Sequence, residues 1–228
     1  MKNVAGSGAK WLDVSAERFP GWIVSFARRH GESVPLGTTL APGRVTFTAP
    51  DGAVAECHPP YQESFAPPRG TAGPAEMAEG IAAHARAPRA VGVILVRLGG
   101  YSAGVFTGYP PVLADSKTGS RPVHGRSAAG GWSQHRFARR REKQADEALR
   151  AAADTAVLVF GRGPRLEAVV LGGDKRAAAG LRDDPRLAPY LALATERFIT
   201  VPDPKRAVLE ATPRLFTAVK VRLTEPSG

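Results

Sequence analysis

The residues best suited to chemistry lie between 124 and 144, where a glycine-rich segment leads into a run of basic side chains. Gly130 and Gly131 permit positive backbone φ angles and a close approach to a ligand. Ser133 and Gln134 follow, and the amide of Gln134 is polar without carrying a charge. The next basic groups are suited to gripping phosphates: Arg136, Arg139, Arg140, Arg141 and Lys143. The pattern predicts an element that holds a polyanion while an uncharged tip enters a narrow space.

A long helix over residues 133–153 is expected to position these groups. Arg136, Arg140 and Lys143 fall on one of its faces, and a rival stripe of apolar residues can pack on a sheet: Ala138, Ala145, Ala148, Leu149 and Ala152. A solvated face usually mixes signs, yet Glu142 is the only acid between 119 and 145. This favours phosphate contact. The loop over 119–132 is longer than ordinary connections, which is typical of functional loops and of linkers.

The charge of the whole chain points to the same kind of partner. The 228 residues include 31 Lys and Arg against 21 Asp and Glu, a formal net charge of +10. A high-GC genome would account for arginine in place of lysine, but not for the net excess. The composition therefore predicts a polyanion, and nucleic acid above all.

Several classes of protein are disfavoured. The single cysteine, Cys57, rules out an internal disulfide and fits a reducing cytoplasm. Cys57 and His58 have no second half of a zinc site, so we expect no metal and no cofactor. Residues 1–11 lack the apolar core of a secretory signal, and the longest apolar run, 90–96, is too short to cross a bilayer.

The N-terminal part predicts a small α/β module over residues 1–74. A helix is expected over 15–30, with Ser15 as its cap and the aromatic residues on one buried face. Strands over 44–49 and 53–57 alternate around Asp51-Gly52, a dipeptide typical of tight hairpin turns. Prolines and glycines then crowd residues 59–74, where we expect a linker.

The second domain is expected over residues 75–228. Its strands are predicted at 91–98, 101–107, 112–116, 155–160, 166–171, 197–201 and 216–223. Its helices, besides 133–153, are predicted at 75–86, 175–182, 186–194 and after a cap at Asp203. The fold class is therefore α/β (α+β): a mixed sheet that begins with an antiparallel meander and continues with alternating helices and strands.

Three segments carry a resemblance to a known family. His124-Gly125-Arg126, Gly130-Gly131 and Arg136-Phe137-Ala138-Arg139 resemble the central domain of archaeal and eukaryotic class I translation release factors. The sequence is more similar still to the actinobacterial branch of the Vms-like release factors, the VLRF family, over residues 88–223. The resemblance implies a ribonuclease-H-like layout. It also implies a cytoplasmic peptidyl-tRNA hydrolase, a carboxylic ester hydrolase that releases nascent chains from stalled large ribosomal subunits.

The resemblance also assigns roles to residues. In that family a Gly-Gly-Gln tip acts on the ester, which implies a catalytic group of Gly130, Gly131, Ser133 and Gln134. In strict register Trp132 stands where the family has its glutamine. The phosphates of rRNA and tRNA would be held by Arg121, Arg126, Arg136, Arg139, Arg140, Arg141 and Lys143. The implied partners are the large ribosomal subunit, rRNA and peptidyl-tRNA, with no membrane, and the protein is expected to be a monomer.

The residues also bear on other functions. A ribonuclease-H-like nuclease needs clustered carboxylates on its first strands, and 91–98 and 101–107 contain none. The chain has no Gly-x-Ser-x-Gly elbow of a serine hydrolase. Gly172-Gly173-Asp174-Lys175 fits an anion site or a capped strand–helix turn, and Asp183-Asp184 fits a metal pair or a turn; the turn is favoured for both. A non-catalytic binder of the ribosome or tRNA stays open as the alternative function.

Overall fold

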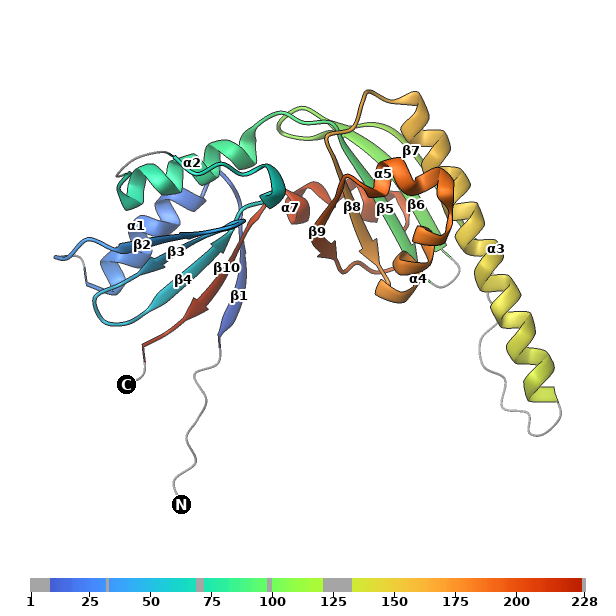
Figure 1. The fold of residues 1–228 in the computed structure, drawn as a ribbon, viewed down its shortest axis with the longest axis horizontal. Coiled ribbons are helices and arrows are strands. Elements are labelled where there is room, and N and C mark those ends of the chain that lie inside the picture. Colours follow the sequence, from blue (N-terminus) through green and yellow to red (C-terminus); the bar gives the residue numbers. More distant parts are fainter. Residues whose placement is uncertain (1–8, 32, 69–71, 98–99, 121–132, 227–228) are drawn as a thin grey trace, which may run out of the picture. The chain divides into compact units, whose positions relative to one another are not determined.

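The computed structural model describes residues 9–226 except 32, 69–71, 98–99 and 121–132 (Figure 1). Over 133–145 it describes the helical backbone but not the side chains. The chain forms two compact units. The N-terminal unit comprises residues 1–87 and 214–228, and the central unit comprises residues 88–213.

The N-terminal unit is built on a five-stranded antiparallel sheet in the order β1-β10-β4-β3-β2. Its strands are β1 (Lys10–Val14), β2 (Gly37–Ala41), β3 (Arg44–Thr48), β4 (Val54–His58) and β10 (Val219–Thr224). Its helices are α1 (Phe19–Arg29), α2 (Pro74–Arg86) and the short 3-10 helix η1 (Gln62–Ser64). Residues of α1 and α2 share one apolar core with every second residue of the strands, so both helices pack on the same face of the sheet (Figure 1).

The aromatic side chains of α1 are core residues, as predicted. Phe19 and Phe26 are fully buried, and Trp22 stacks against both at ring-centroid distances of 6.5 and 5.7 Å. The predicted cap is wrong, because the helix begins at Phe19 with Arg18 in the N-cap position and no side-chain cap. Ser15 lies in the preceding turn, where its carbonyl accepts a hydrogen bond from the Arg18 amide at 3.1 Å.

The predicted hairpin is confirmed, with β3 and β4 paired across Asp51 and Gly52. Gly52 has a φ of +91°, a conformation that favours glycine. Asp51 Oδ1 accepts a hydrogen bond from the Ala53 amide at 2.9 Å, while Oδ2 lies 2.8 Å from Nδ1 of the buried His30. The turn is therefore tied to the C-terminus of α1.

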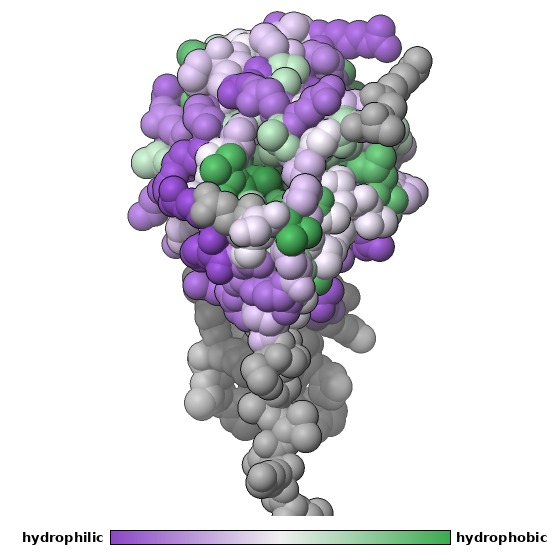
Figure 2. Space-filling view, turned by 90° about the vertical axis from the view of Figure 1, so that its left-hand side faces the viewer, coloured by the Kyte–Doolittle hydropathy of each residue, from purple (hydrophilic) through white to green (hydrophobic). Residues whose placement is uncertain are grey.

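The surface of the N-terminal unit also exposes some apolar side chains. The large ones are Trp11, Val24, Val34 and Leu40. Figure 2 shows several separate apolar patches near the middle of a face that is otherwise mostly hydrophilic. Among the described residues, no helix is both long and apolar enough to cross a membrane.

The central unit contains the predicted mixed sheet, in the order β7-β6-β5-β8-β9. The first three strands are an antiparallel meander, and β8 and β9 continue the sheet in parallel with β5. The strands are β5 (Val91–Arg97), β6 (Gly100–Thr107), β7 (Val112–Ser120), β8 (Ala168–Gly173) and β9 (Ala194–Ile199). The helices of the central unit are α3 (Ser133–Arg162), α4 (Lys175–Gly180), η2 (Leu181–Asp183), η3 (Pro185–Leu187), α5 (Ala188–Leu191) and α6 (Arg206–Glu210). The last helix, α7 (Pro213–Phe216), lies where the chain returns to the N-terminal unit.

The strand predicted over 155–160 is wrong, because these residues form the C-terminal turns of α3. Ala156, Val159 and Phe160 are buried there in the core of the central unit. A short apolar run has the same pattern in a buried strand and in a buried stretch of helix, so only tertiary packing separates them. The predicted cap at Asp203 is also wrong: α6 begins at Arg206 after Lys205, without a side-chain cap.

The chain divides differently from the expected boundary between 74 and 75. The helix α2 packs with the N-terminal unit, which extends to residue 87. The last strand, β10, lies between β1 and β4 rather than in the second sheet. The N-terminal sheet is thus completed by residues from the far end of the chain.

Candidate functional site

The predicted catalytic segment lies partly outside the described residues. Gly130, Gly131, Arg121 and Arg126 belong to the stretch 121–132, which connects β7 to α3 and is not described. Ser133 and Gln134 are the first two residues of α3. Gln134 therefore has a helical backbone in the first turn, and the predicted start of this helix is confirmed.

The first turn of a helix has a particular chemistry. Its first four backbone N–H groups have no acceptor within the helix, and the aligned peptide dipoles give this end a partial positive charge. Gln134 lies within this turn. Its backbone N–H is thus a donor that the helix itself leaves free, in a position that favours negative charge.

The helix α3 is anchored over its C-terminal part. Its 30 residues span about 45 Å. Ala148, Ala152, Ala153, Ala156 and Val159 are buried against the sheet, which confirms the predicted apolar stripe over its described side chains, Ala148, Leu149 and Ala152. The part that begins at Ser133 continues beyond the sheet (Figure 1).

Small residues allow α3 to approach the sheet closely. A Cβ atom added to Gly92 of β5 would lie 2.8 Å from Cζ of Phe160. Alanines fill most of the buried positions of the helix. Close contact with a rigid sheet fixes the direction in which the N-terminal part of α3 extends, and hence where its basic residues are carried.

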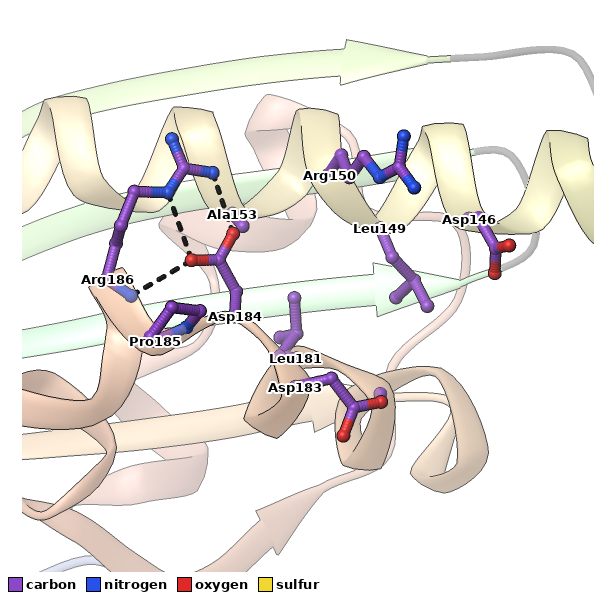
Figure 3. Close-up of a pocket in the computed structure, with 10 residues that line it drawn as sticks. Asp146, Leu149, Arg150, Ala153, Leu181, Asp183, Asp184, Pro185 and Arg186 are labelled. Carbon is purple, nitrogen blue, oxygen red and sulfur yellow. Dashed lines mark hydrogen bonds and ion pairs between the residues drawn. The ribbon is translucent and has the colours of Figure 1, made fainter.

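A cavity of about 500 Å³ lies beside the anchored part of α3 (Figure 3). Leu149 of α3 and Leu181 of η2 point toward each other across it. Its polar lining consists of Asp146, Arg150, Asp183, Asp184 and Arg186. No group of three metal-ligating side chains occurs among the residues that the structure describes.

An ion-pair network ties η3 to α3 at this cavity. Arg186 Nη2 lies 2.8 Å from Asp154 Oδ1 of α3 and 2.7 Å from Asp184 Oδ2. Asp184 Oδ1 also accepts a hydrogen bond from the Arg186 amide at 3.0 Å, so the predicted turn at Asp183-Asp184 is confirmed. The hydrogen bonds from the Arg186 side chain lower the pKa of Asp184, and the amide of Arg186 contributes in the same direction.

This pKa shift predicts a pH dependence. Because the pKa of Asp184 is lowered on folding, its stabilising contribution is present above the ordinary aspartate pKa of about 3.9. It is lost as the pH falls through the lower, folded pKa. Asp184→Asn should therefore be less stable than wild type by a constant small amount between pH 5 and 7, roughly as for other exposed pairs. The difference should shrink below about pH 4.

Urea unfolding of both proteins from pH 3 to 7 measures this difference. Asp183→Asn is the matched control, since no ion pair of its side chain is seen among the described residues. A difference in stability between wild type and Asp184→Asn that grows as the pH falls would contradict the prediction.

The segment Gly172–Lys175 forms a strand–helix turn. Gly173 has a φ of +101°, and Asp174 Oδ1 accepts a hydrogen bond from the Ala177 amide at 2.8 Å. The predicted cap of α4 is thereby confirmed. The conformation of the turn explains why glycines occupy these positions, and no bound anion is needed to explain them.

Comparison with known proteins identifies the class. Residues 89–222 match the family described as "Actinobacteria/chloroflexi VLRF1 release factor". The class is that of the release factors. The chain belongs to the acVLRF1 family, and the resemblance seen in the sequence is confirmed.

Three solved structures are also similar. The crystal structure of the archaeal translation termination factor aRF1 has 15% identity and a TM-score of 0.41, covering 92% of this chain and 68% of its own. The "Vms1 mitochondrial localization core" has 10% identity and a TM-score of 0.35, covering 87% and 81%. Archaeoglobus fulgidus Pelota has 11% identity and a TM-score of 0.29, covering 95% and 64%. No curated protein matches the sequence significantly.

Proposed function

We propose that this protein is a peptidyl-tRNA hydrolase that releases nascent chains from stalled large ribosomal subunits. The observation that carries the proposal is the membership of residues 89–222 in a release-factor family, joined to the position of Gln134 at the start of α3. The length of α3 lets its N-terminal end reach into a narrow cavity of the ribosome. The partners are the large subunit, rRNA and peptidyl-tRNA, and the protein acts as a monomer in the cytoplasm.

The basic residues of α3 hold the RNA. Arg136, Arg139, Arg140, Arg141 and Lys143 lie within about two turns of the helix, downstream of Gln134. Contacts to phosphates fix the position and orientation of a protein on RNA without reading its sequence. Arg121 and Arg126 guide the preceding loop. This arrangement suits a factor that must act on any peptidyl-tRNA.

The reaction is hydrolysis of the ester between the peptide and the 3′-terminal ribose. A water oxygen attacks the ester carbonyl, the bond from the carbonyl carbon to the ribose oxygen breaks, and the ribose oxygen takes up a proton. The side-chain amide of Gln134 orients the water, and its backbone N–H donates to the developing oxyanion. Gly130, Gly131 and Ser133 let the backbone approach the ester. RNA hydroxyls carry the proton, so no cofactor is needed.

The direct test is release of the peptide from peptidyl-tRNA bound to purified large ribosomal subunits. The expected result is catalytic turnover of the ester by the wild-type protein, measured as free tRNA and free peptide. Free peptidyl-tRNA without subunits is the control and should be hydrolysed much more slowly. Binding to the subunits without release would disprove the hydrolase.

A second function is favoured by one residue. Trp132 stands at the position of the glutamine when Arg136-Phe137 is held in register with the release factors. The alternative is therefore a non-catalytic protein of ribosome rescue that binds the large subunit or tRNA and uses the loop only for recognition. The same assay distinguishes the two, because this alternative predicts full binding with no release.

A further inference from the structure

Both long helices of the N-terminal unit, α1 and α2, pack on the same face of its sheet, so neither covers the other face. On β1, Leu12 and Val14 point into the core shared with α1 and α2, so Trp11 and Asp13 point to the other side. The same alternation places Lys220 and Arg222 of β10 on that side. On β4 it places Glu56 and His58 there. We call this set of residues, with Arg44 and Thr46 of β3, the open face.

An aromatic pair lies across the open face. Trp11 is 56% exposed although it is the largest kind of apolar side chain. Its ring lies 5.5 Å from the ring of His58, tilted by 46°. Trp11 is in register with Arg222, and His58 is in register with Lys220, so the two rings meet over the strand that separates them. More than half of the Trp11 surface is left to the solvent.

The cations beside this pair have no ion-pair partner in the part of the chain that the structure describes. Among the described residues, neither Lys220 nor Arg222 forms an ion pair, whereas Glu56 lies 2.8 Å from His58 and 3.9 Å from Arg44. Glu56, the acid at the centre of the face, thus already has His58 and Arg44 as partners. Asp13, at the edge strand, is the other acid on this face. Lys220 is in register with Asp13 and Arg222 with Glu56, but neither cation lies within ion-pair distance of a described carboxylate, so both can bind anions.

We infer that the open face binds single-stranded RNA, with a base stacked on Trp11 and phosphates held by Lys220 and Arg222. Aromatic side chains on a sheet, flanked by unpaired cations, offer stacking to a base and charge to its backbone. A duplex keeps its bases stacked on one another, so the indole selects unpaired nucleotides. This site is separate in the chain from α3, and its occupancy does not depend on the hydrolase activity.

The fluorescence of Trp11 tests the stacking directly. In the full chain with Trp22→Phe and Trp132→Phe, Trp11 is the only indole, because the sequence has three tryptophans. A 10-nucleotide oligouridine should quench its emission in a saturable way, and a duplex of the same length should not. Equal responses to both RNAs, or no response to either, would overturn the inference.

Affinity measurements give the second arm. Trp11→Ala should bind the same oligouridine about tenfold more weakly than wild type. Arg222→Ala should lower the salt dependence of binding by about one phosphate contact. Val24→Ala and Arg28→Ala alter exposed residues of α1, on the other side of the sheet, and should not reproduce these losses. If Trp11→Ala and Val24→Ala bind alike, the face does not bind RNA and is left for a protein partner.

Discussion

Replacing Gln134 with alanine is expected to slow nascent-chain release from large ribosomal subunits by about 10²–10³-fold, the usual cost of removing one positioning group at an oxyanion. Alanine keeps the backbone N–H and favours the helix, so the first turn of α3 is preserved. The loss then reports the side-chain amide alone. Single-turnover release with saturating protein measures this change free of binding effects.

The matched control is Gln144→Ala. Gln144 lies in the same helix about 15 Å further along the axis, too far to reach the same ester. This variant should release the peptide at the wild-type rate. Both variants should bind the subunits with the wild-type salt dependence, because neither removes a cation. Full activity of Gln134→Ala would disprove the proposed role of its side chain.

The backbone of the same residue can be tested separately. Gln134→Pro removes the N–H that the first turn leaves without a helical acceptor, and proline is tolerated in this part of a helix. If the N–H donates to the oxyanion, the proline variant should lose more activity than the alanine variant. Equal activities would restrict the role of Gln134 to its amide.

Local features of the fold were predictable from the sequence because their causes are local. The dipeptide Asp51-Gly52 predicted the hairpin, because Gly52 takes the positive φ that the turn requires. Asp174 and Asp184 were identified as turn and cap residues, because a short carboxylate meets the amides that follow it. The aromatic face of α1 followed from its helical period.

Features set by distant contacts were not predictable in this way. The run from Ala156 to Phe160 is apolar enough for a strand, and only its packing on the sheet as a helix decides its conformation. The pairing of β10 with β1 and β4 joins residues 162 to 213 positions apart, which no local pattern encodes.

The candidate sites show the same difference between local and distant features. Gln134 and the basic helix were identified from a contiguous motif, which a sequence displays directly. The open face was missed, because Trp11, His58 and Arg222 come from three strands that only the sheet order makes neighbours. Trp11 gave one signal, because it is an indole in a short strand, next to Lys10 and two residues before Asp13. Its partners on the other strands could not be inferred.

The close approach of β8 to β5 gives the second large effect, for Gly173→Ala. A Cβ atom at this position would lie 2.1 Å from the carbonyl oxygen of Val96, far inside contact distance. The same oxygen accepts a hydrogen bond from the Asp174 amide at 2.8 Å, so it cannot move away without breaking that bond. The φ of +101° adds strain for any residue with a side chain.

We therefore expect Gly173→Ala to lower the free energy of unfolding of the central unit by about 3 kcal/mol or more, from backbone strain and overpacking together. Hydrogen exchange of the β5 and β8 amides in increasing urea measures this loss within the unit itself. Gly161→Ala is the control: it lies in α3 with nothing within 4 Å of its added Cβ, and it should be neutral or stabilise the helix by up to about 1 kcal/mol. If the two variants were equally stable, the strands would be free to separate at Gly173. The turn would then fix neither the start of α4 nor, through the sheet, the direction in which α3 extends.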